Sequence, residues 1–204
     1  MSSAPLASAA LLLLCACSGG LKSNLPVSQV YVLRPSWSAG APRTPAPAST
    51  VQVAWPLAAP GLASDSIVVL RAGERLDYYS AARWAAPAPA MLQGLTIQAL
   101  RAANKFALVE SEAGPFTSEY MLSLELTHFE AEYAGGGPPT VHVALVCTLG
   151  RRASRDAIAS FTAESRVTAD ADHMQSVVAA FERATGETLA QIAANISVPA
   201  TPKP

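Results

Sequence analysis

Apolar and polar residues alternate along several short stretches of this chain, and that two-residue period is typical of strands with one buried face. The clearest stretches are residues 120–127 and 141–149, where leucine or valine alternates with polar or small side chains. A turn of three glycines and two prolines, residues 135–139, separates them and predicts a long antiparallel hairpin. Similar runs, several of them bounded by proline or glycine, predict strands at residues 29–34, 50–55, 66–71, 75–79, 106–110 and 158–167.

Two helices complete the predicted fold. Residues 90–103 follow Pro87 and Pro89, and proline suits a first helical turn because its missing N–H would have no partner there. The second helix follows Asp172, which with Gln175 resembles a capping box. It repeats apolar residues at helical spacing: Val177, Phe181, Ala184, Leu189, Ile192 and Ile196. We therefore expect an α+β fold, a two-layer sandwich of a mixed, mostly antiparallel sheet with two helices packed on one face.

The N-terminus carries a separate apolar run, residues 4–16. A helix needs roughly 20 residues to cross a bilayer, so this run is too short to span one and fits a secretory signal. It ends in Leu14-Cys15-Ala16-Cys17, which resembles the bacterial lipobox, with a small residue before the cysteine and leucine three positions before it. We expect Cys17 to be lipidated, Cys15 being the poorer candidate. The alternative is an ordinary signal peptide cut nearby, with Cys17 incidental.

The domain organisation follows from these segments. We expect a signal peptide at 1–16, a lipidated tether at 17–27, one folded domain at 28–197 and a disordered tail at 198–204. A lipidated Cys17 anchors the protein to a membrane by more than one acyl chain. Ser18 after it resembles the pattern sent to the outer membrane in enterobacteria, so we expect the periplasmic face of the outer membrane, with the inner membrane as the alternative. Cys147 has no second cysteine in the mature domain to form a disulfide.

Composition excludes several function classes. The chain has 204 residues, a net charge of −1 and only 14% charged residues, so no basic field favours a nucleic-acid partner. Half of the residues are hydrophobic, which excludes general disorder. The sequence lacks the G-x-S-x-G, H-E-x-x-H and C-x-x-C motifs and a glycine-rich phosphate loop. We therefore expect no catalytic residues, no enzyme activity and no cofactor.

Two histidines lie in the arms of the predicted hairpin. His128 and His142 can face each other across it as a minimal pair of metal ligands, but no carboxylate spacing completes a set of three or four. Glu130 and Glu132 are interpreted as a solvated strand face, so we expect no metal site. Cys147 lies on the apolar side of the hairpin and is interpreted as a small buried hydrophobe.

Aromatic and arginine side chains gather in the segment that leads into the first helix. Tyr78, Tyr79, Arg83 and Trp84 are of the types that often anchor protein interfaces, and we consider them candidate partner-interface residues. A tryptophan before a helix also often fills the top of a core, and Arg83 can pair with Asp77. The sequence leaves the interface and the structural interpretations open.

These motifs, in this order, resemble the ABC-type transport auxiliary lipoproteins, the family of paraquat-inducible protein C. The resemblance covers residues 27–196 and rests on the lipobox and on Tyr31-Val32-Leu33, Tyr78-Tyr79, Arg83-Trp84-Ala85-Ala86-Pro87 and Met91-Leu92. It implies a non-catalytic lipoprotein that docks in a lipid transport system between the inner and outer membranes. The implied partners are a mammalian-cell-entry domain protein and its ABC permease and ATPase, and a homo-oligomer is compatible with the family.

Two other functions stay open at the level of the sequence. One is an outer-membrane lipoprotein that assists the assembly or stability of another envelope complex. The other is a periplasmic hydrolase that uses a serine or aspartate no motif reveals. Neighbouring genes for an ATPase, a permease and a mammalian-cell-entry protein would favour transport, and activity of a purified soluble fragment would favour the hydrolase.

Overall fold

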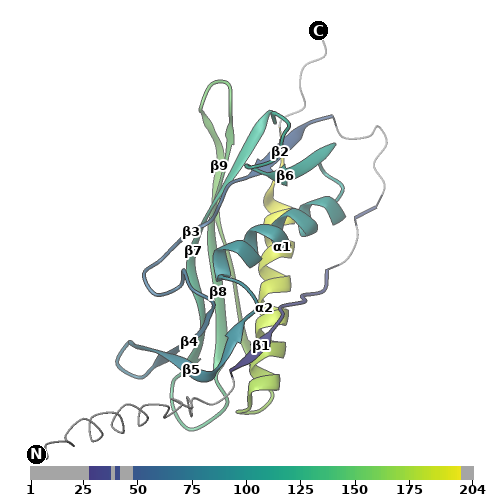
Figure 1. Ribbon diagram of the computed structural model, residues 1–204. Coiled ribbons are helices and arrows are strands. Elements are labelled where there is room, and N and C mark those ends of the chain that lie inside the picture. Colours follow the sequence, from purple (N-terminus) through teal and green to yellow (C-terminus); the bar gives the residue numbers. More distant parts are fainter. Residues whose placement is uncertain (1–27, 38–39, 42–47, 199–204) are drawn as a thin grey trace, which may run out of the picture.

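The computed structural model describes residues 28–37, 40–41 and 48–198 (Figure 1). The predicted signal peptide, the tether with Cys17 and all but the first residue of the predicted tail lie outside this range. In chain order the elements are β1 (Gln29–Tyr31), β2 (Thr50–Val53), β3 (Leu57–Ala58), β4 (Ser66–Arg71), β5 (Arg75–Trp84), α1 (Ala88–Ala102), β6 (Leu108–Ser111), β7 (Tyr120–Tyr133), β8 (Thr140–Arg151), β9 (Ala157–Thr168) and α2 (Met174–Asn195). No helix in the described part of the chain is long and apolar enough to cross a membrane.

Strand β7 is the centre of a mixed sheet. One edge of β7 pairs with β8 along its whole length, and β8 pairs with β9, so that these three long strands form an antiparallel meander. The other edge of β7 pairs in succession with β2, β3 and β4, all of them parallel to it. Beyond these, β6 pairs with β2, and β5 and β1 extend the sheet from β4.

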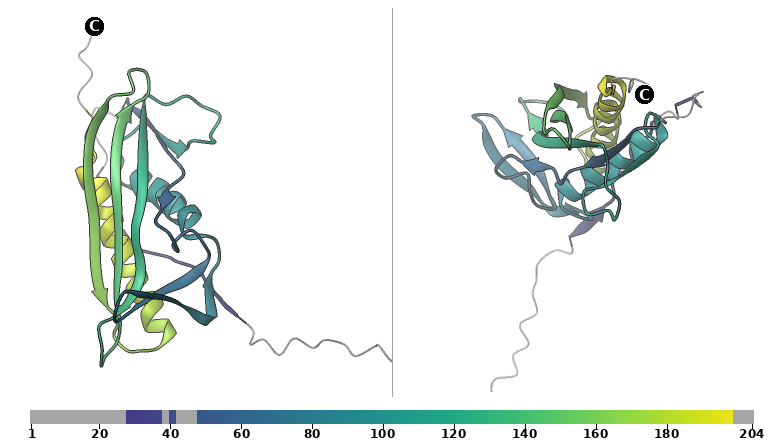
Figure 2. Two further views of the ribbon diagram at one scale, coloured as in Figure 1. Left: turned by 90° about the vertical axis from the view of Figure 1, so that its left-hand side faces the viewer. Right: turned by 90° about the horizontal axis from the view of Figure 1, so that it is seen from above.

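Both helices lie on the same face of the sheet, so the predicted two-layer α+β architecture is confirmed (Figures 1 and 2). Helix α2 packs along β8 and β9, and α1 packs near β2 and β6 and against α2. The view in the left panel of Figure 2 looks onto the opposite face of β7, β8 and β9, with α2 behind the strands. The apolar stripe predicted for the second helix, from Val177 to Ile196, is buried.

An aromatic cluster at the core joins the sheet to α2. Trp84 meets Phe181 edge-on with ring centroids 5.1 Å apart, and Phe129 lies 5.7 Å from Trp84 and 5.0 Å from Phe181. All three side chains are fully buried, and such ring pairs add about 0.5–1.5 kcal/mol each beyond the burial of their area. The cluster therefore ties the ends of β5 and β7 to α2.

Several element boundaries differ from the predictions, most of all those of β1 and β5, and one short strand was not predicted. Strand β1 ends at Tyr31 because the following segment leaves the sheet and crosses α2, where Arg34 N–H donates to Glu182 Oε1 at 2.9 Å. Strand β5 continues to Trp84 instead of ending at residue 79. The two-residue β3 is too short to show any alternation in the sequence and went unpredicted.

The predicted capping box of the second helix is wrong. His173 is the N-cap, and its side chain accepts a hydrogen bond from Ser176 N–H at 3.3 Å. Asp172 is engaged elsewhere, because its Oδ1 accepts a hydrogen bond from Tyr133 Oη at 2.6 Å. The Asp172 carboxylate therefore binds Tyr133 of β7 instead of capping the helix as the local sequence pattern predicted.

Two glycines in the helices provide a matched test of the packing. A Cβ at Gly94 in α1 would meet nothing within 4 Å, whereas a Cβ at Gly186 in α2 would lie 2.9 Å from the Ser36 carbonyl oxygen. We expect Gly94→Ala to raise the free energy of unfolding by about 0.5–1 kcal/mol, through helix propensity alone. Gly186→Ala is expected to lower it by about 1 kcal/mol, because overlap with a fixed backbone outweighs that gain. Urea denaturation of the two variants checks both signs, and stabilisation by both would show that the crossing segment does not press on α2.

Candidate functional site

The four candidate interface residues all lie on β5, but not on one face. Tyr78 pairs with Val68 of β4, and Arg83 pairs with Ser66. The chain therefore advances by two residues in β4 but by five residues in β5 between these two pairs. This register irregularity adds an odd number of residues and exchanges the faces of β5. As a result Tyr78 points to the face away from the helices, while Trp84 points into the core.

Trp84 is therefore a core residue. Its side chain is completely buried, and its backbone N–H donates to Asp65 O at 2.7 Å. A side chain in this position reaches no partner protein unless the domain unfolds locally, so the structural interpretation of Trp84 holds. Of the other three candidates, Tyr78 and Arg83 are exposed and Tyr79 is partly buried.

Arg83 is exposed, but its partner is not the one considered from the sequence. Its Nη1 lies 2.9 Å from Asp65 Oδ2, and the two side chains are 49% and 39% exposed. Exposed ion pairs of this kind contribute about 0–1 kcal/mol to the free energy of unfolding, so the Arg83–Asp65 pair adds little to stability. Asp77 instead lies 3.3 Å from Arg71 Nε, and the pKa of its carboxyl is lowered by the hydrogen bond from Tyr78 N–H and by Arg71.

Tyr79 belongs to a chain of hydroxyl groups. Its hydroxyl lies 2.9 Å from that of Tyr133, which in turn donates to Asp172 Oδ1. Burial raises the pKa of the Tyr79 phenol, and burial together with the hydrogen bond to Asp172 raises that of Tyr133, so both stay protonated. The chain links β5, β7 and the start of α2, which gives Tyr79 a structural role.

Tyr78 and its neighbour Leu76 remain as an exposed apolar surface. Their side chains are 44% and 40% exposed and lie over Gly61, where an added Cβ would be 2.7 Å from Leu76 Cδ1. Gly61 has φ +88°, a conformation that favours glycine, so the loop beneath them is specified by the sequence.

The backbone next to these two side chains is also available. Strand β1 pairs only with residues 82–84 of β5. Among the described residues no strand pairs with 75–81 on the side away from β4, and we call this segment the open edge of β5. An unpaired edge presents N–H and C=O groups that can accept another strand. The open edge and the Leu76–Tyr78 surface together form the candidate docking site.

The interpretation of Glu130 and Glu132 as a solvated strand face is wrong for Glu130. Its side chain is buried, and His128, Glu130, Glu132 and His142 form one compact group whose ligand atoms lie within 4.8 Å of one another. The sequence pattern placed the two histidines opposite each other but missed the carboxylates that complete the group. Cys147, by contrast, is buried as expected, and burial raises the pKa of its thiol to about 12.

A groove with arginines was not singled out from the sequence. Arg151, Arg152 and Arg155 line it at the turn between β8 and β9. Arg151 donates to the Tyr120 hydroxyl at 3.4 Å, and Arg152 donates to Gln52 Oε1. Two of the three arginines therefore already form hydrogen bonds within the protein. The run Arg151-Arg152-Ala153-Ser154-Arg155 at a strand end was the available signal. The groove is positively charged, but these internal contacts make it the lesser candidate.

The sequence and the fold of this chain are similar to those of known proteins. A family model described as ABC-type transport auxiliary lipoprotein component matches residues 31–193. The crystal structure of protein XCC0632 from Xanthomonas campestris, described under DUF330, has a TM-score of 0.71 and 27% identity and covers 80% of this chain and 92% of that one. A second crystal structure, of an uncharacterized protein, has a TM-score of 0.66 and 16% identity, with 84% and 99% covered, and shows the shared fold. No curated protein matches the chain.

The contrast between Trp84 and Tyr78 is testable. We expect Trp84→Ala to lower the free energy of unfolding by about 3–5 kcal/mol, because it leaves a cavity beside Phe129 and Phe181. Tyr78→Ala is expected to change it by less than about 1 kcal/mol, because the side chain is nearly half exposed. Denaturant unfolding measures both values. Equal losses for the two variants would place Tyr78 in the core as well and remove it from the docking site.

Proposed function

Because the chain belongs to the family of ABC-type transport auxiliary lipoprotein components, we propose that it is the accessory lipoprotein of a system that transports lipids between the inner and outer membranes. The observation that carries this proposal is the extent of the family match, residues 31–193, which takes in nearly all of the sheet and both helices. Its role is to dock and not to catalyse.

The proposed partners are a mammalian-cell-entry domain protein together with its ABC permease and ATPase. In such a system the ATPase supplies the energy and the other components supply the path for lipid. An accessory lipoprotein then needs only an anchor and a surface that recognises the assembly. The sequence lacks the G-x-S-x-G, H-E-x-x-H and C-x-x-C motifs and a glycine-rich phosphate loop, which agrees with that division of work.

The proposed anchor is the lipid on Cys17, at the periplasmic face of the outer membrane. Only ten residues, 18–27, separate this cysteine from the first described residue, and they are small or polar enough to act as a tether. The inner membrane is the alternative location, and the outcome of fractionation decides between the two.

We assign docking to the open edge of β5 and the Leu76–Tyr78 surface. Backbone pairing along residues 75–81 would give affinity, and the exposed apolar side chains would give contact area on one face of the added strand. Arg75 and Asp77 alternate with Leu76 and Tyr78 along the same segment. A partner strand with apolar residues on one face and charged residues on the other would match this pattern.

Affinity capture tests the proposed assembly. The intact lipoprotein, captured from solubilised envelope membranes and analysed by mass spectrometry, is expected to recover a mammalian-cell-entry protein with its permease and ATPase. Recovery of a different outer-membrane complex without these components would instead identify an assembly or stability factor. Recovery of the chain alone would contradict both.

The docking surface has its own test. Replacing Leu76 and Tyr78 together by Asp is expected to reduce recovery of the partners about tenfold or more, since interface hot spots contribute about 2 kcal/mol or more. Phe116→Asp is the matched control, because Phe116 is also an exposed large hydrophobic residue, at 62%, but lies outside β5. Unchanged recovery with the double variant, at normal thermal stability, would place the docking surface elsewhere.

Lipidation is tested by the two cysteines next to the predicted cleavage site, Cys15 in the signal peptide and Cys17 at the start of the tether. Cys17→Ser is expected to release the protein from the membrane fraction or to leave it unprocessed, because serine has no thiol to acylate. Cys15→Ser is expected to leave processing and membrane attachment unchanged. Fractionation with immunoblotting and a mass measurement of the mature protein check both. Normal attachment of the Cys17→Ser variant would exclude Cys17 as the anchor.

A further inference from the structure

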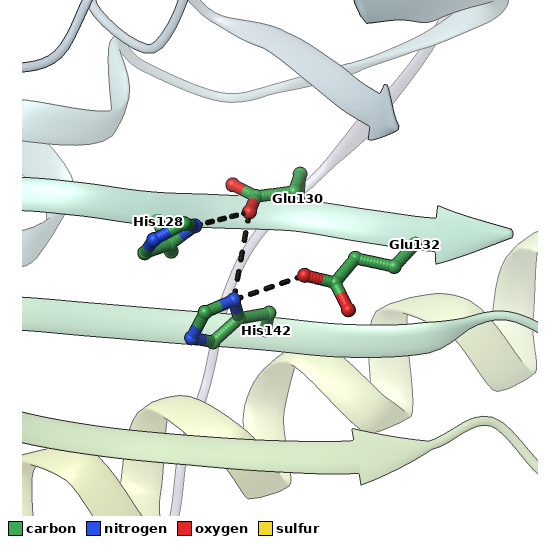
Figure 3. Close-up of side chains that lie close together, drawn as sticks. All are labelled: His128, Glu130, Glu132 and His142. Atoms are coloured by element: carbon green, nitrogen blue, oxygen red, sulfur yellow. Dashed lines mark hydrogen bonds and ion pairs between the residues drawn. The ribbon is translucent and has the colours of Figure 1, made fainter. Parts of the chain in front are cut away.

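Four side chains with metal-ligating groups converge on the face of the sheet that is turned away from the helices (Figure 3). His128 Nδ1 lies 2.7 Å from Glu130 Oε1. His142 Nδ1 lies 3.0 Å from Glu132 Oε1 and 3.7 Å from Glu130 Oε1. The two imidazole rings are stacked, with centroids 4.0 Å apart. Two nitrogen and two oxygen atoms thus face one small volume between β7 and β8.

The backbone explains why these four residues meet. Residues 128, 130 and 132 follow the two-residue period of one face of β7, and Glu130 pairs in register with His142 of β8. A bulge between Leu126 and His128 sets which face this is, because two residues of β7 there correspond to one of β8. Before the bulge the even-numbered residues of β7 are buried against the helices, and after it they point the other way.

Burial makes the group unlike an ordinary surface cluster. The side chains of Glu130 and His142 are 7% and 2% exposed, whereas that of His128 is 45% exposed. In the described part of the chain the ion-pair partners of Glu130 are the two histidines. Arg166, the nearby cation, is engaged by Glu132 at 2.6 Å and by Glu164 at 3.3 Å. A buried carboxylate without a permanent cation is costly, so the site favours a positive charge.

Two of the four side chains are held in place by hydrogen bonds from behind. Glu130 Oε2 accepts from Phe129 N–H at 2.6 Å, and Glu132 Oε2 accepts from Arg166 Nη1. The third, His142, has its Nε2 2.9 Å from Glu164 Oε1 without a well-formed hydrogen bond between them. Glu164 therefore occupies the position from which a carboxylate supports a metal-ligating histidine, by accepting the proton of its distal nitrogen once that hydrogen bond is aligned.

We propose that His128, Glu130, Glu132 and His142 bind one divalent transition-metal ion, for which Zn²⁺ is the best fit. Two imidazoles and two carboxylates are donors that Zn²⁺ accepts in tetrahedral sites, with bonds of about 2.0–2.2 Å. Ca²⁺ and Mg²⁺ prefer all-oxygen sets and are expected to bind poorly. Because the two rings are stacked, one must turn for both nitrogens to reach the same ion, and the exposed His128 has the room to do so.

Metal binding would fasten β7 to β8 near the glycine-rich turn of the hairpin. The ion replaces the proton that each Nδ1 shares with a carboxylate, and the distal nitrogen of His142 keeps its proton towards Glu164. Since the unfolded chain does not assemble the four ligands, binding stabilises the folded state and raises the melting temperature. This proposal does not depend on the transport function.

Titration of the full-length lipoprotein tests the site. Detergent-solubilised protein, treated with a chelator and desalted, is titrated with ZnCl₂ in a calorimeter and melted with and without Zn²⁺. We expect one ion per chain and a rise in melting temperature with Zn²⁺ but not with Mg²⁺ or Ca²⁺. His128→Ala is expected to weaken Zn²⁺ binding at least tenfold. Since His128 is partly exposed, this variant is expected to fold.

The control is His173→Asn, which removes the third histidine but keeps a good N-cap for α2. It is expected to bind Zn²⁺ as the unmodified protein does.

Glu130→Gln provides a second variant of nearly the same shape and is expected to weaken binding as His128→Ala does. Absence of Zn²⁺ binding, or equal binding by the unmodified protein and His128→Ala, would overturn the proposal and leave a hydrogen-bonded histidine–carboxylate network.

Discussion

Two interruptions of strand alternation decide what each face of the sheet presents. A strand directs successive side chains to opposite faces, so an odd insertion exchanges the core and solvent faces for every residue after it. In β7 this happens at the bulge after Leu126, and in β5 between Tyr78 and Arg83. The first brings Phe129 into the core and the four-residue group to the outer face. The second puts Trp84 against Phe129 and leaves Tyr78 exposed.

The two interruptions also place the two candidate sites on one surface. Pairing across the sheet aligns Tyr78, Val68, Glu130, His142 and Arg166 in a single row through β5, β4, β7, β8 and β9. Neighbouring strands are about 4.8 Å apart, so Tyr78 and Glu130 lie on the order of 10 Å from each other along this row. The histidine–carboxylate group and the docking surface therefore belong to the same face, and the helices occupy the other.

The sequence predicted the regular parts of this fold and the family. Alternation located the long hairpin and β9, helical spacing located the buried stripe of α2, and the order of the motifs led to a family that the family model confirms. What it did not predict depends on register. Nothing local marks Thr127 as the point where β7 changes faces, so Glu130 was interpreted as solvated. Likewise, the irregular pairing of β4 with β5 directs Trp84 and Tyr78 to opposite faces of the sheet, although both are residue types that are common in interfaces.

The short segment after β1 has a mechanical consequence. Were the chain anchored through Cys17 as proposed, a pulling force would reach the described domain near Gln29, where β1 has only three residues paired with β5. Such a short ladder would yield early, but the chain then crosses α2 with Leu33 buried and Arg34 N–H bonded to Glu182. Tension is therefore transferred to the longest helix and to the packed core. A tether would thus pull on a segment that is held at two places, by the sheet through β1 and β5 and by the helical layer through α2.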